Sequence, residues 1–175
     1  MQRNNVDTRE SNLTYQIRLG CLRVVCLNGL IVSMGAFPSV RVAHRGNIVD
    51  EVVTSALEMA ERFGVLAAQV ERMEKRQLQK DEQIQFAEKA LAIRYPEPAQ
   101  SGLLPAQLLT CRRAQDIGND LWTCLNKVQE SLLRGGLSRR TASGRLTRTR
   151  AITSIAEDVR INSRVWQLAE ETLAA

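Results

Sequence analysis

Residues Asp120 to Gly136 read DLWTCLNKVQESLLRGG, and this stretch organises the second half of the chain. Its apolar side chains recur at intervals of three and four residues, which is the spacing of one face of a helix. Gly135 and Gly136 follow directly, and glycine commonly ends a helix because it tolerates a left-handed backbone. The pattern predicts a helix over about residues 117–133, with an apolar face formed by Ile117, Leu121, Leu125, Val128 and Leu132.

A second amphipathic helix is predicted at the end of the chain, where apolar residues again recur at spacings of three and four. Ser154 followed by Glu157 matches a capping box, so this helix begins either near Ile152 or at Ser154. Its expected face comprises Ile152, Ile155, Val159, Asn162, Trp166, Ala169 and Leu173.

Each of these two helices carries a tryptophan and an asparagine one turn apart, Trp122 with Asn126 and Trp166 with Asn162. Tryptophan at helical spacing usually packs in a core, and a buried amide normally finds a hydrogen-bond partner. We therefore expect both pairs to face a common core. The alternative hypothesis is that the indole rings are exposed and stack on nucleic-acid bases.

Three further helices are predicted upstream. Asn47 suits a helix N-cap, and the apolar residues after it follow helical spacing. Pro96 and Pro98 close the second helix, while Pro105 suits the first turn of a short third one. The expected bounds are about 47–76, 81–94 and 105–109.

Residues 13–44 are rich in β-forming side chains and predict an antiparallel meander of three to four strands. Asn28 and Gly29 indicate a two-residue hairpin turn, because both residues tolerate a positive φ. Residues 1–12 are polar and predict a flexible lead-in. The expected fold is therefore α+β: one domain over 13–175, with a small sheet over 13–44 and a mostly helical part over 47–175.

The positive charge of the chain is concentrated in one place. The chain has 24 basic and 19 acidic residues, for a net charge of +5. The stretch from Arg134 to Arg150 alone contributes +6, so the remaining residues sum to −1. A local excess of this kind is typical of a surface that binds a partner.

This basic stretch is the candidate nucleic-acid site. Serine, threonine and glycine separate its arginines, and no acidic residue occurs between Ser131 and Ala156. Guanidinium groups match phosphates, which predicts sequence-tolerant contact with a nucleic-acid backbone. The alternative is that this stretch is a mobile loop between two helices, and that the charges of the loop only keep the protein soluble. The candidate contacts are Arg134, Arg139, Arg140, Arg145, Arg148 and Arg150.

A second candidate anion site lies just before the first long helix. Arg45 precedes the helix start, where free backbone N–H groups favour anions, although an ordinary solvated turn fits the same residues. His44 is the only histidine, and we expect it to cap the sheet edge or bond the turn. No known catalytic motif is present, so neither an enzyme nor a cofactor is expected.

The four cysteines are Cys21, Cys26, Cys111 and Cys124, and their spacings are not those of zinc sites. We expect buried, reduced thiols, no bound metal and a cytoplasmic location. The chain starts with polar residues rather than a signal peptide, and no apolar run is long enough to span a membrane.

Four stretches of the chain carry a resemblance to a known family: LRVVCLNGL, RVAHRGNIVDEVV, DLWTCLNKVQESLLRGG and TRAITSIAEDVRINSRVWQLAE. They resemble an uncharacterised family of phage- and plasmid-borne bacterial proteins, over about residues 13–173. Members of that family usually carry a further N-terminal portion, which this chain is expected to lack. The order of a sheet followed by a long helix is also similar to single-strand annealing recombinases, which is an analogy of fold only.

Together these features predict a DNA-binding protein of a mobile element that acts in annealing or recombination. A second hypothesis is a counter-defence protein, such as an anti-CRISPR inhibitor, that binds a host immune complex. We also expect a homo-oligomer, because a short sheet leaves open edges that another copy can pair with.

Overall fold

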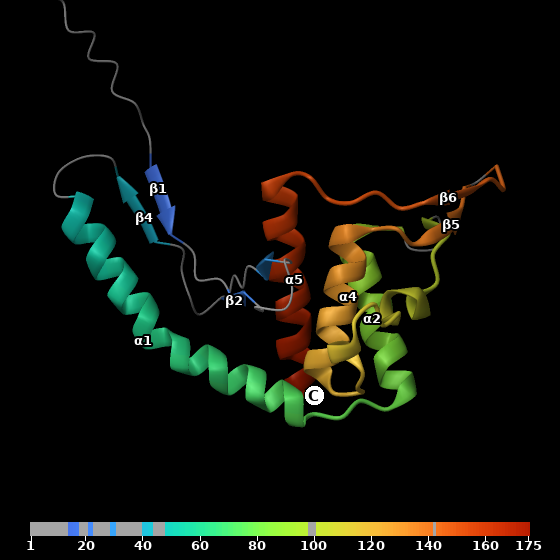
Figure 1. The fold of residues 1–175 in the computed structure, drawn as a ribbon, viewed down its shortest axis with the longest axis horizontal. Coiled ribbons are helices and arrows are strands. Elements are labelled where there is room, and N and C mark those ends of the chain that lie inside the picture. The colour runs from blue at the N-terminus through green and yellow to red at the C-terminus, as the bar shows by residue number, and fades with distance from the viewer. Residues whose placement is uncertain are drawn as a thin grey trace, which may run out of the picture.

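A computed structural model shows a short N-terminal sheet region followed by a long helix and a bundle of helices (Figure 1). The predicted α+β class is confirmed, and the structure is mostly helical. The predicted lead-in, His44, Arg45 and Asn47 lie outside the described residues. The structure describes residues 14–17, 21–22, 29–30, 40–43, 48–97, 101–141 and 143–175.

The N-terminal strands form two nested pairs instead of the predicted meander. β1 (Thr14–Ile17) pairs antiparallel with β4 (Val40–Ala43), and β2 (Cys21–Leu22) pairs antiparallel with β3 (Gly29–Leu30). Because Gly29 pairs with Leu22, the predicted two-residue turn at Asn28 and Gly29 is wrong.

The long helix α1 spans Ile48–Lys75, close to its predicted bounds. Its C-terminal half packs on the helical bundle, where Leu66 and Met73 are fully buried. Its N-terminal half runs beside β1 and β4 and projects away from the bundle (Figure 1). Several apolar residues of this half remain exposed: Val49 by 70%, Val53 by 51% and Leu57 by 62%.

The helix α4 (Leu121–Arg134) is the centre of the bundle, and every residue from Leu121 to Leu133 is buried. It starts four residues later than predicted because Asp120 caps it, accepting a 2.8 Å hydrogen bond from the Thr123 amide. Ile117 therefore lies outside the helix and is 78% exposed, contrary to the prediction. Packed around α4 are α1, α2 (Lys80–Arg94), α5 (Ile155–Ala174) and the 3₁₀ helix η1 (Pro105–Leu109); a second 3₁₀ helix is η2 (Ala114–Asp116).

The tryptophans lie where α4 meets α5, as predicted. The rings of Trp122 and Trp166 meet edge to face, with centroids 6.3 Å apart and planes at 81°. Asn126 donates to the Trp122 carbonyl, and Asn162 accepts from Gln129 at 2.6 Å. All of these side chains are buried, which rules out base stacking on exposed indoles in this structure.

Ser154 caps α5, since its hydroxyl accepts from the Glu157 amide, and this confirms the later of the two predicted starts. Ile155 is in the first turn but is 81% exposed, so it does not belong to the predicted apolar face. No helix in the described part of the chain is both long and apolar enough to cross a bilayer.

Candidate nucleic-acid interface

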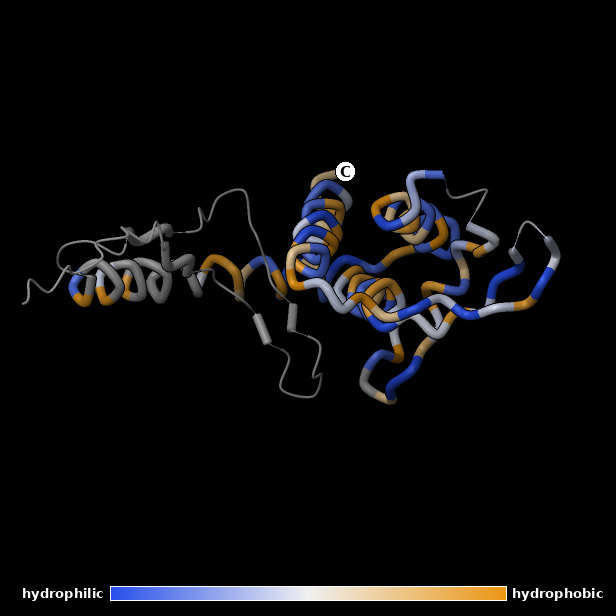
Figure 2. The backbone as a smooth tube through the Cα atoms, turned by 90° about the horizontal axis from the view of Figure 1, so that it is seen from above, coloured by the Kyte–Doolittle hydropathy of each residue, from blue (hydrophilic) through white to orange (hydrophobic). Residues whose placement is uncertain are grey.

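The basic stretch forms a β-hairpin and not the predicted loop. β5 (Ser138–Arg140) pairs antiparallel with β6 (Leu146–Arg148), and the register sets Arg139 opposite Thr147. The hairpin projects from the bundle at the end opposite the N-terminal half of α1 (Figure 1). The residues of the hairpin are mostly hydrophilic, as Figure 2 shows. No strand was predicted here because strands are recognised in a sequence by alternating apolar residues.

The tip of the hairpin is fixed by its own hydrogen bonds. The Gly144 amide donates to the Thr141 carbonyl at 2.8 Å, and the Thr141 amide donates to the Arg145 carbonyl at 2.9 Å. Gly144 has a φ of +78°, the left-handed conformation that short hairpin loops commonly need. The Thr141 hydroxyl also accepts from the Arg145 amide at 3.1 Å. Arg145 is thus held on an ordered turn.

The base of the hairpin is anchored to the bundle. The Gln107 side chain donates to the Ser138 carbonyl at 2.9 Å, and the Arg94 guanidinium donates to the Arg150 carbonyl at 2.6 Å. Arg94 also donates to the carbonyl of Leu132 near the end of α4. Neither of these tethers was predicted, because each joins residues far apart in the sequence. Together they fix the hairpin relative to α2 and α4.

Of the seven predicted contacts, four arginines are exposed on or beside the hairpin. Arg140 and Arg148 lie on one face of it, because Arg140 is two residues from Ser138 on β5 and Arg148 is directly opposite Ser138. Arg139 is on the other face and is half-buried, and its Nε has no hydrogen-bond partner within the described structure. Arg45 lies outside the described residues. The four exposed arginines are Arg140, Arg145, Arg148 and Arg150.

The remaining predicted contact, Arg134, belongs to a separate cluster around Glu130. The Glu130 carboxylate accepts from Arg113 at 2.8 and 3.1 Å, and lies 3.8 Å from Arg134 Nε. Arg112 adds a third positive charge nearby and donates to the Gly135 carbonyl at 2.7 Å. The hydrogen bond from Arg113 lowers the pKa of Glu130, which keeps this carboxylate ionised.

Sequence reasoning missed Arg94, Arg112 and Arg113 as neighbours of the site. A signal existed for Arg94, because a basic residue in the last turn of a helix can bond nearby carbonyls. Arg112 and Arg113 were a second basic pair in the sequence, but only the packing of their segment against α4 brings them to Glu130.

Comparison with known proteins places the chain in a family. The family model described as "Domain of unknown function (DUF932)" matches residues 7–166. The chain belongs to the DUF932 family. It is 37% identical over 168 residues to "UPF0380 protein YfjQ" and 36% identical over 168 residues to "UPF0380 protein YafZ", both of Escherichia coli (strain K12).

Each alignment covers 96% of this DUF932 chain and 61% of the relative, so the chain spans less than two thirds of the length of these curated proteins. No solved structure matches the chain.

The cysteines of this DUF932 chain differ in environment. Cys124 is buried in α4, and burial raises the pKa of its thiol to about 11. Cys111 is exposed, so the prediction of a buried thiol is wrong at this position. Its thiol donates to the Arg113 carbonyl at 3.0 Å, between η1 and η2.

Proposed function

We propose that the β5–β6 hairpin binds the phosphate backbone of nucleic acid without reading the bases. One observation carries the proposal: the hydrogen-bonded hairpin projects from the bundle and presents Arg140, Arg145 and Arg148 to solvent. Within the described residues no carboxylate forms an ion pair with these three side chains, whereas Arg113 and Arg134 are paired with Glu130. Their charge is therefore available to a partner.

The chemistry of the hairpin favours phosphate over base recognition. A planar guanidinium donates two parallel hydrogen bonds to a phosphate, and arginine is always charged. The hairpin has no aromatic residue on which a base could stack, and Leu146 is its only large exposed apolar residue. A two-stranded ribbon also fits the major groove of a duplex. These properties support sequence-tolerant binding.

The biological setting that we propose is a phage or plasmid, with a role in DNA annealing or recombination. It rests on the resemblance to mobile-element proteins and on the absence of a catalytic motif in the sequence. A cytoplasmic location in the bacterial host goes with it.

The test is a salt titration of binding to single- and double-stranded DNA of unrelated sequences. Wild type should bind all of them with similar affinity, and its affinity should fall steeply with salt. The triple variant R140A/R145A/R148A should bind far more weakly, and on duplex its salt slope should decrease by roughly 0.9 for each phosphate that the variant no longer neutralises.

A matched control removes the same charge elsewhere. Arg72, Lys75 and Lys80 are exposed cations near the junction of α1 and α2, far from the hairpin in Figure 1. The variant R72A/K75A/K80A should bind like wild type. Equally weak binding by both triple variants would mean that only net charge matters, and would refute a hairpin site. Capture of one host protein in a nuclease-resistant complex, without DNA binding, would instead support the counter-defence role.

A further inference from the structure

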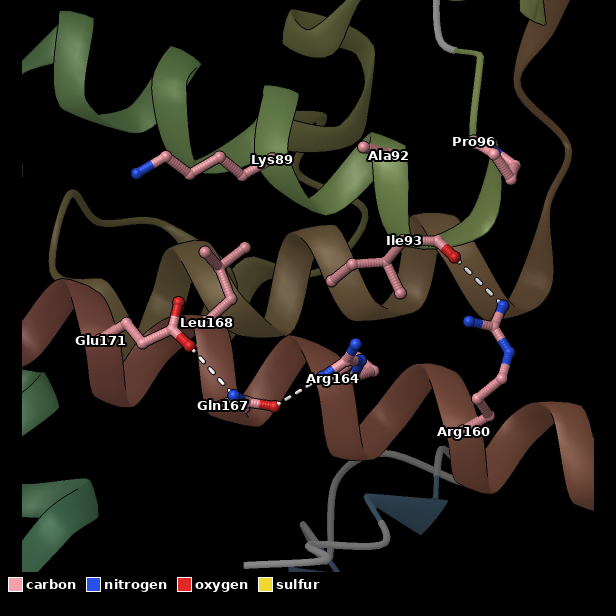
Figure 3. A pocket seen from close by; sticks show the side chains of 9 residues that line it. All are labelled: Lys89, Ala92, Ile93, Pro96, Arg160, Arg164, Gln167, Leu168 and Glu171. Carbon is pink, nitrogen blue, oxygen red and sulfur yellow. Dashed lines mark hydrogen bonds between the residues drawn. The ribbon is translucent and has the colours of Figure 1, made fainter. Parts of the chain in front are cut away.

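The α2–α5 groove is a hollow of about 510 Å³ that lies between these two helices (Figure 3). Aliphatic residues form part of its wall, with Ile93 from α2 and Leu168 from α5. Basic residues stand around them. The described residues that line it are Lys89, Ala92, Ile93, Pro96, Arg160, Arg164, Gln167, Leu168 and Glu171.

The hydrogen bonds of the groove leave it with positive charge. Arg164 donates to the Gln167 side chain at 3.0 Å, and Gln167 in turn donates to Glu171 at 3.0 Å (Figure 3). The Gln167 amide thus separates the Arg164 guanidinium from the Glu171 carboxylate. Arg160 is bound to Glu157 and to the Ile93 carbonyl, so it bridges α5 to the end of α2. Lys89 is exposed at the other end.

An aliphatic wall with a basic rim fits a protein segment better than a nucleic acid. Among the described residues of the lining no aromatic ring is present on which a base could stack, and the aliphatic wall offers no hydrogen-bond donor to a phosphate. Aliphatic side chains from an amphipathic helix pack well against aliphatic walls, and acidic residues on that helix would meet the basic rim. The fitting partner is therefore an acidic amphipathic helix.

The chain itself carries such a helix. Residues 48–61 of α1 contain four acidic residues and no basic residue. Val49, Val53 and Leu57 recur at intervals of four on this segment, so they form one stripe, and all three are more than half exposed. Figure 1 shows this half of α1 projecting away from α2 and α5, so the stripe does not fill the groove of its own chain.

We propose that the exposed stripe of α1 docks into the α2–α5 groove of a second copy of the chain. Docking covers Val49, Val53 and Leu57 and sets acidic residues against Lys89 and Arg164. Each copy has one stripe and one groove. Reciprocal docking therefore forms a two-fold symmetric dimer with two identical stripe–groove contacts. The open sheet edges are not needed for this assembly.

The test uses two variants, one that alters the stripe and one that alters the groove. The variant V53D/L57D changes only exposed side chains of the stripe, and K89E/R164E reverses charge only in the groove. Wild type should be dimeric in analytical ultracentrifugation, and each variant alone should dissociate with a Kd raised at least about tenfold. A mixture of the two should form a heterodimer, because one intact stripe then meets one intact groove.

Matched controls are available on the same helices. Val65 is 54% exposed on α1, eight residues beyond the last member of the stripe, and Lys80 is exposed on α2 outside the groove. V65D and K80E should remain dimeric, and circular dichroism should show native helix content in every variant. A wild type that stays monomeric at about 0.1 mM would overturn the inference. So would failure of the mixed variants to associate, which would point to pairing of α1 with α1.

Discussion

Arg113 and Glu130 form a bidentate ion pair that connects the segment before α4 to the buried surface of that helix. Arg113 Nη2 donates to one carboxylate oxygen at 2.8 Å and Nε to the other at 3.1 Å. The Glu130 side chain is only 8% exposed, so few waters can replace the guanidinium. A carboxylate that is buried with one dominant partner depends on that partner for its solvation.

Replacing Glu130 by glutamine should therefore destabilise the protein, because Arg113 loses its charged partner in a buried setting. We expect a loss of about 2 kcal/mol at neutral pH, measured as the free energy of unfolding in urea. The exposed pair of Arg160 with Glu157 supplies the control, and E157Q should cost less than about 1 kcal/mol. Equal effects of the two variants would contradict the special role of Glu130.

The ion pair between Arg113 and Glu130 should also make the free energy of unfolding depend on pH. The pKa of Glu130 is lowered in the folded state by Arg113, so the folded protein binds this proton less readily than the unfolded chain. The stabilisation is present above the ordinary pKa of 4.5 and is lost as the pH falls through the lower folded value. Wild type should lose more stability than E130Q between neutral pH and about pH 3, and parallel pH profiles would contradict this.

The helices were predictable because their apolar spacing and caps are local features. Helix bounds at α1 and α2 were close to those observed, and Ser154 was recognised as a cap. The β5–β6 hairpin was not predictable, since its strands are polar and are held by Gln107, Arg94 and the backbone of other segments. The candidate arginines were identifiable from charge alone, but their pairing and burial depend on tertiary packing.

Alanine substitutions at Gly135 and Gly144 should differ in cost, because an added Cβ would clash with neighbouring atoms at Gly135 but not at Gly144. Both glycines have positive φ, at +65° and +78°, and alanine at Gly144 should cost about 1 kcal/mol through backbone strain. Gly135 also has a ψ of −142°, which glycine adopts far more readily than alanine, so the strain there should be about 1–3 kcal/mol. At Gly144 an added Cβ meets nothing within 4 Å. At Gly135 it would lie 2.6 Å from the Arg150 carbonyl, so G135A should cost roughly a further 1–3 kcal/mol. Thermal unfolding of both variants tests this difference, and equal midpoints would contradict it.

Asn162 links two buried or half-buried polar groups across the α4–α5 contact. Its Oδ1 accepts from Gln129 at 2.6 Å, and its Nδ2 donates to Asp158 at 2.6 Å. N162L should cost about 1–3 kcal/mol, because the Gln129 amide loses its partner inside the bundle. The double variant Q129L/N162L removes both amides and should recover part of that stability. A double variant less stable than N162L in urea would show that packing, not hydrogen bonding, sets the cost.

The pKa of Asp158 should respond to the same substitution. Burial already raises the pKa of this carboxyl, and the hydrogen bond from Asn162 acts in the opposite direction. Removing that bond in N162L should raise the pKa further, because the ionised form loses a donor. Titration of the Asp158 carboxyl by NMR, in wild type and in N162L, measures the shift. An unchanged Asp158 titration in N162L would contradict the assignment.

Cys111 and Cys124 should differ sharply in reactivity toward a thiol reagent. Only the thiolate reacts, and at neutral pH the raised pKa of about 11 leaves Cys124 almost wholly protonated, while its burial in α4 blocks access. Cys111 is exposed beside Arg113 and should be modified by iodoacetamide before Cys124, as measured by peptide mass mapping of the native protein. C111S should abolish that early modification without changing the slow labelling of Cys124. In urea both sites should react at similar rates, and a rate gap that persisted there would mean that the fold does not protect Cys124.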